Sequence, residues 1–65
     1  MRAGAQVKSL REVAYQGERV PANTPGFVLE AADVEGFLVV EWSDRTGLYS
    51  VHASDVEETR PPEIH

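Results

Sequence analysis

The chain has 65 residues, of which 42% are hydrophobic, and eleven acidic against six basic residues give it a formal net charge of −5. This length supports one small domain with a thin core, because a domain of about 60 residues buries only about 60% of the surface of its unfolded chain. With no cysteine, two histidines and no apolar run near the roughly 18 residues of a membrane span, the chain is expected to be cytoplasmic, without metal, cofactor or membrane contact.

The N-terminal part predicts one strand and a long loop. Residues 1–6 contain no apolar segment that could serve as a signal peptide, and we expect them to be a flexible lead. In segment 7–15 the apolar residues recur every third position, a spacing that also fits a helix. We favour a strand there because every later segment has β character. Segment 16–25 predicts a loop, since its two prolines cannot donate to a sheet ladder.

The rest of the chain predicts short strands separated by turns. The strongest strand is 37–42, and its continuous apolarity predicts contacts on both faces. The other expected elements are a strand at 27–31, a turn at 33–36, a turn at 43–47, a strand at 48–51, a turn of 3₁₀ helix at 53–55 and a strand at 56–58. After them, the paired prolines of 60–65 favour an extended tail.

Alternation along the strongest strand predicts which side chains are buried. Leu38, Val40 and Trp42 share one face, which we place in the core, so Phe37, Val39 and Glu41 point outward. The full predicted core is Val28, Leu38, Val40, Trp42, Tyr49 or Val51, and Val56, with Val7 or Leu10 and Val13 from the first strand. Five short strands with a long first loop and tight later turns predict a small closed barrel over residues 7–59.

Four stretches follow a recognisable pattern, namely a Gly-x-Val strand after a long first loop, a Val-Glu-aromatic strand, a glycine turn and a terminal Asp-hydrophobic-Glu. They are Thr24 to Glu30, Leu38 to Trp42, Asp44 to Gly47 and Ser54 to Glu57. In this pattern the chain resembles short bacterial SH3-like barrel families, whose members mostly have no assigned function. The resemblance runs from about Val7 to Glu58 and implies an all-β, five-stranded SH3-like barrel. Its motifs are structural glycines and core positions, so it implies little about activity.

Other proteins of this fold use features that this chain lacks. Ferredoxin-binding subunits and a photosystem I subunit present basic faces, whereas this chain is acidic. Eukaryotic SH3 domains carry an Ala-Leu-Tyr-Asp-Tyr strand and paired tryptophans. This chain has only Ala14-Tyr15 in place of that strand and only one tryptophan, Trp42. The plasmid-borne dihydrofolate reductase has a Val-Gln-Ile-Tyr stretch that 48–51 does not reproduce. None of these activities is therefore carried over.

No catalytic constellation is visible in the sequence. Glu41 with Asp44, and Glu57 with Glu58, are expected to be solvated charges, because catalytic carboxylate pairs need a concave and partly dry site. A barrel this small has its interior filled by side chains. His52 has no evident serine, cysteine or acidic orienting partner and is expected at the surface. The chain is therefore predicted not to be an enzyme.

The leading hypothesis is an interaction module that binds a protein through the first loop and the face beside it. This module would have an accessory, regulatory or immunity-type role in a bacterium or phage. The candidate partner-binding residues are Tyr15, Glu18, Arg19, Phe37, Val39 and Tyr49. Tyr15 and Tyr49 either frame a groove beside the first loop or pack on the barrel rim.

Two alternatives stay open. One is a Tudor- or KOW-like nucleic-acid-binding module that uses Lys8, Arg11, Arg19 and the aromatic residues, although the net negative charge disfavours nucleic acid. The other is a homo-oligomeric enzyme whose site forms only between subunits. The sequence alone does not choose the oligomeric state.

Overall fold

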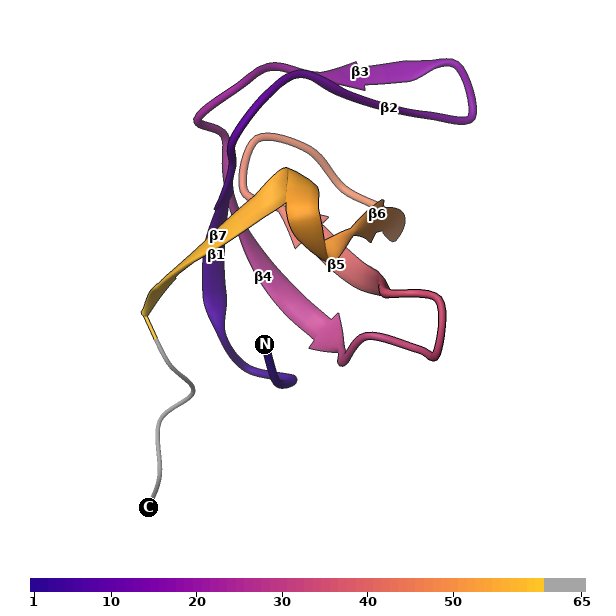
Figure 1. The fold of residues 1–65 in the computed structure, drawn as a ribbon. Coiled ribbons are helices and arrows are strands. Elements are labelled where there is room, and N and C mark those ends of the chain that lie inside the picture. Colours follow the sequence, from indigo (N-terminus) through magenta and orange to yellow (C-terminus); the bar gives the residue numbers. More distant parts are fainter. Residues whose placement is uncertain (61–65) are drawn as a thin grey trace.

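The computed structural model describes residues 1–60 and shows an all-β chain (Figure 1). Its elements are β1 (Gln6–Ser9), β2 (Val13–Tyr15), β3 (Glu18–Val20), β4 (Pro25–Glu30), β5 (Phe37–Trp42), β6 (Tyr49–His52), the 3₁₀ turn η1 (Ala53–Asp55) and β7 (Val56–Arg60). The predictions of an all-β domain and of a 3₁₀ turn before the last strand are both confirmed. Within residues 1–60, no helix is long and apolar enough to cross a membrane.

The strands form two antiparallel sheets rather than the single five-stranded set expected. The main sheet has the order β6-β5-β4-β1-β7, so that β4 lies at its centre and β6 and β7 are its edges. Strands β2 and β3 form a separate two-stranded sheet. In Figure 1 this β2–β3 hairpin extends across one end of the main sheet. In the main sheet, β1 pairs with β7, so that residues far apart in the chain lie side by side.

The β2–β3 hairpin corrects the prediction of a continuous loop over 16–25. Gln16 and Gly17 have φ angles of 49° and 81°, and two consecutive positive φ values make the tight turn that suits the twist of a hairpin. The turn brings Val20 opposite Val13, so that both side chains enter the core. The prediction was wrong because the prolines come too late to prevent pairing: one follows β3 and the other is the first residue of β4.

One buried cluster joins the main sheet to the hairpin. It consists of Ala5, Val7, Val13, Val20, Val28, Leu38, Val40, Trp42, Tyr49, Val51 and Val56. The predicted alternation in β5 is confirmed, since Leu38, Val40 and Trp42 are at most 1% exposed. Both Tyr49 and Val51 are buried. Val7 is buried and Leu10 is exposed, because a bend at Leu10 separates β1 from β2.

Strand β4 is irregular near its C-terminal end, in its pairing with β5. A β-bulge between Val28 and Glu30 removes Leu29 from the regular pairing with β5, and both Leu29 and Glu30 are exposed. At the start of the strand, Gly26 lies under the indole of Trp42, where an added Cβ would approach Cε3 to 2.7 Å. The backbone of β4 therefore packs directly on the largest core side chain.

Both ends of the described chain contact the main sheet. The N–H of Gly4 donates to the carbonyl of Val28 at 2.8 Å, and Ala5 is fully buried, although both residues fall in the lead predicted at 1–6. At the other end Arg60 belongs to β7 and lies opposite Gln6 of β1. The rest of the tail predicted at 60–65 lies outside the described residues.

Candidate functional site

Apolar side chains gather on the outward face of β4 and β5. Phe27 and Phe37 are each 41% exposed, Leu29 is 38% exposed, and Val39 between them is half-buried. We call this surface the outer sheet face and define it by Phe27, Leu29, Glu30, Phe37, Val39, Glu41, Ser50 and His52. Contiguous exposed apolar residues on neighbouring strands are a feature of interaction sites, whereas single exposed apolar residues are ordinary.

Strand register fixes the layout of the outer sheet face. Phe27 lies opposite Glu41 and Glu30 lies opposite Val39 across β4 and β5. On the other side of β5, Val39 lies opposite Ser50, and Phe37 opposite His52. The apolar groups therefore form a diagonal band from Phe27 through Val39 to Phe37, with a carboxylate beside it on each strand.

The turn between β4 and β5 holds Phe37 in place. The Asp33 carboxylate accepts hydrogen bonds from the backbone N–H of Phe37 at 3.1 Å and of Glu35 at 2.9 Å. These two bonds lower the pKa of the Asp33 carboxyl from its ordinary value of 3.8. The N–H of Gly36, at φ +89°, donates to the Asp33 carbonyl, and the Gly36 carbonyl accepts from Ala53 in η1. The turn is thus bonded both to itself and to η1.

His52 supports Phe37 from the neighbouring strand. Its ring meets the Phe37 ring edge to face, with centroids 5.2 Å apart and an interplanar angle of 86°. Nδ1 of His52 accepts the N–H of Ser54 at 3.2 Å and lies 2.8 Å from the Ser54 hydroxyl. The expectation that His52 has no serine partner was wrong, because η1 brings a residue only two positions away back to the ring. The contact caps η1 and leaves His52 half-buried.

Four of the predicted partner-binding residues form a separate group at the hairpin. The Tyr15 and Tyr49 rings contact each other, with centroids 5.8 Å apart. The two rings therefore pack against each other. Tyr49 is only 7% exposed, so Tyr15 presents the accessible ring. Glu18 lies opposite Tyr15 on β3, and Glu18 and Arg19 are both exposed.

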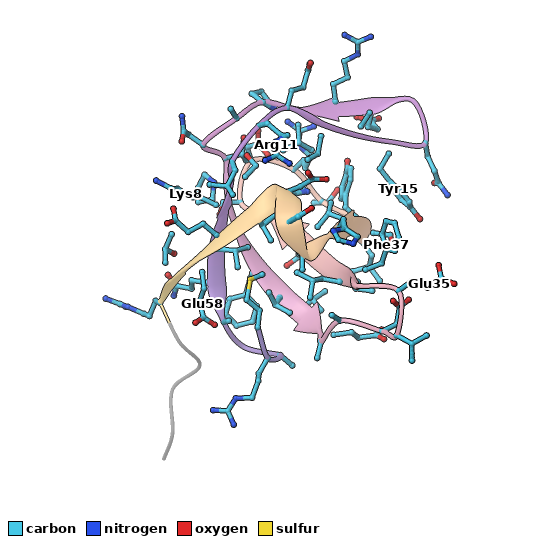
Figure 2. The ribbon with its side chains drawn as sticks, viewed as in Figure 1. Lys8, Arg11, Tyr15, Glu35, Phe37 and Glu58 are labelled. Atoms are coloured by element: carbon cyan, nitrogen blue, oxygen red, sulfur yellow. The ribbon has the colours of Figure 1, made fainter. Side chains whose placement is uncertain are left out.

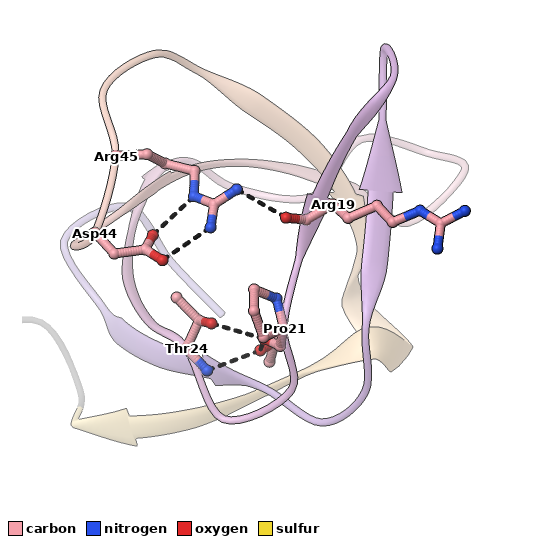
Figure 3. Close-up of polar contacts among 6 residues, drawn as sticks. Arg19, Pro21, Thr24, Asp44 and Arg45 are labelled. Atoms are coloured by element: carbon pink, nitrogen blue, oxygen red, sulfur yellow. Dashed lines mark hydrogen bonds and ion pairs between the residues drawn. The ribbon is translucent and has the colours of Figure 1, made fainter.

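Arg45 fastens the hairpin to the turn between β5 and β6 (Figure 3). Its Nε and Nη2 donate to the two carboxylate oxygens of Asp44 at 2.8 Å each, and its Nη1 donates to the carbonyl of Arg19 at 2.8 Å. The bonds with Arg45 lower the pKa of the Asp44 carboxyl and raise the pKa of the Arg45 guanidinium. The backbone of β3 is therefore bonded to the turn between β5 and β6.

The structure thus divides the six predicted residues between two surfaces. Phe37 and Val39 belong to the outer sheet face, whereas Tyr15, Glu18, Arg19 and Tyr49 belong to the hairpin group. Figure 2 shows Tyr15 and Phe37 on the same side of the ribbon. Tyr15 contacts one end of β6 through Tyr49, and Phe37 contacts the other end through His52. Tyr49 and His52 are three residue steps apart along the strand, or about 10 Å.

Sequence reasoning missed Phe27, Leu29 and Glu30 as members of the surface. The signal for the first two was present, because Val28 was placed in the core and its two neighbours in a strand must then point outward. Glu41 was placed on the outward face with Phe37 and Val39 and was treated as a solvated charge. Its position beside Phe27 follows from the register of β4 and β5, which the sequence does not specify.

The cations that a nucleic-acid-binding site would use each have an acidic partner. Lys8 lies 3.6 Å from Glu57, Arg19 lies 3.9 Å from Glu12, and Arg11 is bonded to Asp55.

Within residues 1–60, no three histidine or acidic side chains are grouped so that they could hold a metal ion. Comparison of the chain with protein-family models, curated proteins and solved structures finds no match.

Proposed function

We propose that this chain is a small, non-enzymatic interaction module that binds a protein partner through the outer sheet face. The observation that carries the proposal is the band of exposed apolar side chains, with Phe27, Leu29 and Phe37 each about two-fifths exposed on adjacent strands. A domain with so thin a core gains stability by burying apolar side chains. Exposed aromatic groups beside carboxylates suit a protein interface, which combines an apolar centre with a polar rim.

We also propose that the fold is an SH3-like barrel. Three features support this assignment: the sheet order β6-β5-β4-β1-β7, the hairpin inserted between β1 and β4, and the 3₁₀ turn directly before the last strand. The irregularities in the pairing of β1 with β7 and of β4 with β5 support it as well, because bulges increase the bending and twist that a small barrel needs. In such a barrel the outer sheet face is a convex wall beside the hairpin.

Charge favours a protein over a nucleic acid as the partner. The outer sheet face contains Glu30 and Glu41 and no lysine or arginine. A phosphate backbone brought to this face would meet two carboxylates, whereas binding to nucleic acid depends on neutralising phosphates with cations. The cations of β1 and the hairpin are already engaged with acidic groups.

The experiment compares three forms of the tagged chain as baits in extracts of its native cell. They are the unaltered chain, the double variant Phe27→Ser with Phe37→Ser, and the control Leu48→Ser. Leu48 is 59% exposed and apolar but lies outside the outer sheet face, in the turn between β5 and β6. Circular dichroism first verifies that all three forms are folded.

We expect a protein that the unaltered chain and the Leu48→Ser control recover and the double variant loses. Equal recovery by all three baits would contradict the proposed site. Recovery of no protein above background would contradict the proposed function.

A further inference from the structure

Two carboxylates lie within the apolar band of the outer sheet face. Glu30 lies opposite Val39 and directly follows Leu29, while Glu41 lies opposite Phe27. Sheet spacings put the Cα atoms of Glu30 and Glu41 about 8 Å apart, since they are two residues apart along the strands and one strand apart across them. The carboxylates are therefore close enough to act on one bound segment.

Nothing in the described chain neutralises these two carboxylates. The salt bridges of residues 1–60 join Lys8 to Glu57, Arg11 to Asp55, Arg19 to Glu12 and Arg45 to Asp44. Glu30 and Glu41 take part in none of them, and the same strands carry no lysine or arginine. A binder that covers the apolar band would have to supply the positive charge itself, because desolvating an unpaired carboxylate is costly.

We propose that the outer sheet face binds a cationic, extended segment of a partner protein, in which two lysine or arginine residues two positions apart share one face with apolar residues. The inference rests on the proposed function and specifies its partner. An extended segment places side chains i and i+2 on one face about 7 Å apart, which matches the separation of Glu30 and Glu41. Apolar side chains on the same face of that segment then cover Phe27, Val39 and Phe37.

The same charges argue against the other occupants of an apolar sheet face. A second copy of the chain in a two-fold interface would place two copies of Glu30 and Glu41 in one interface with no cation from either face, and like charges oppose such a contact. A membrane with anionic headgroups and a nucleic acid are both disfavoured for the same reason. A cationic polypeptide is the occupant that satisfies both the apolar and the acidic residues.

The test is an NMR titration of the ¹⁵N-labelled full chain with three short peptides. The probe is acetyl-Leu-Ser-Lys-Ser-Lys-Ser-Leu-amide, whose lysines and leucines share one face when it is extended. One comparison peptide has glutamate in place of both lysines, and the other has serine in place of both leucines. We expect the probe to bind more tightly than either comparison peptide. We also expect it to shift the amide signals of β4 and β5 near Phe27, Leu29 and Val39.

Two matched variants separate a local contact from net charge. Glu30→Gln with Glu41→Gln removes the charges of the outer sheet face, while Glu57→Gln with Glu58→Gln removes the same charge from β7. Figure 2 shows Lys8 and Glu58 on the side of the ribbon away from Phe37. We expect the first pair to weaken probe binding about fivefold and the second by less than about twofold, as for two exposed ion pairs. Equal weakening by both pairs, shifts on another surface, or equal binding of the glutamate peptide would overturn the inference.

The same variants distinguish this inference from the proposed function. A native partner that depends on Phe27 and Phe37 but still binds the Glu30→Gln, Glu41→Gln variant at full strength would overturn the cationic segment and leave the interaction module standing. If no partner depends on Phe27 and Phe37, the proposed function itself is contradicted, and the inference about its partner is contradicted with it.

Discussion

Trp42 shows at the scale of one residue how a thin core is filled. Its side chain is 1% exposed and is the largest fully buried side chain of the described residues. The indole lies against the backbone of Gly26, where any larger residue would collide with it. Glycine at this position therefore lets the indole ring pack directly on the backbone of β4.

Replacement of Trp42 by alanine tests this packing. A large cavity at such a site costs about 3–5 kcal/mol, and a domain of this size has little more stability than that. We therefore expect Trp42→Ala to lose its cooperative thermal transition, followed by circular dichroism. Leu48→Ala is the control, since Leu48 is 59% exposed and a surface change of this kind costs within about 0.5 kcal/mol. Cooperative melting of Trp42→Ala near the temperature of the unaltered chain would contradict the central place of the indole.

The identity of most core residues could be predicted from the sequence, because alternation in a strand depends only on neighbouring residues. Leu38, Val40 and Trp42 follow that pattern. Ala5 and Val20 do not, since Ala5 is small and precedes the first strand, and Val20 stands alone between charged residues and a proline. Their burial depends on contacts with distant segments.

At the scale of elements, the turns decide which strands form. Strand β3 has one apolar residue and was not expected, yet it forms because Gln16 and Gly17 return the chain onto β2. The signal available was a glycine-containing pair between two short segments, which is typical of a tight hairpin. Pro21 and Pro25, which both follow β3, favoured the prediction of a loop over the whole segment 16–25.

The turn between β4 and β5 gives a pH-dependent prediction. The two backbone bonds to Asp33 lower the pKa of its carboxyl, so the charged form is favoured in the folded state. This contribution to stability is complete above the ordinary pKa of 3.8 and is lost as the pH falls through the lower folded value. We therefore expect Asp33→Ala to be less stable than the unaltered chain at neutral pH, and the difference to shrink below about pH 4.

Urea unfolding followed by the fluorescence of Trp42 across a pH series measures this difference. Glu35→Ala is the matched control, because its exposed carboxyl lies in the same turn and makes no hydrogen bond among the described residues. A difference between Asp33→Ala and the unaltered chain that stays constant down to pH 2 would show that the charge of Asp33 does not act on the turn.

At the scale of the whole molecule, the candidate site combines strands that are separate in the sequence. The outward direction of Phe37 and Val39 was predicted from alternation within one strand. The neighbours Phe27, Leu29 and Glu30 join them only because β4 pairs with β5 in one register and bulges at Leu29. A shift of one residue would turn these side chains to the other face, and no local sequence feature fixes that choice.

The hairpin group and the outer sheet face also differ in their surroundings. Arg45 fixes the hairpin by bonds to Asp44 and to the backbone of Arg19, and Tyr15 rests on the buried Tyr49. The hairpin is thus held in place by hydrogen bonds and ring packing, whereas the outer sheet face presents exposed apolar side chains.

Site-specific crosslinking tests the central claim most directly, namely that the outer sheet face is where this chain meets its partner. The chain has no cysteine, so one cysteine can carry a maleimide-linked benzophenone at Phe27 in the face or at Leu48 outside it. After irradiation in native extract, we predict a covalent adduct with a second protein from Phe27→Cys and none from Leu48→Cys. Adducts of equal yield from both positions, or an adduct only from position 48, would contradict the claim.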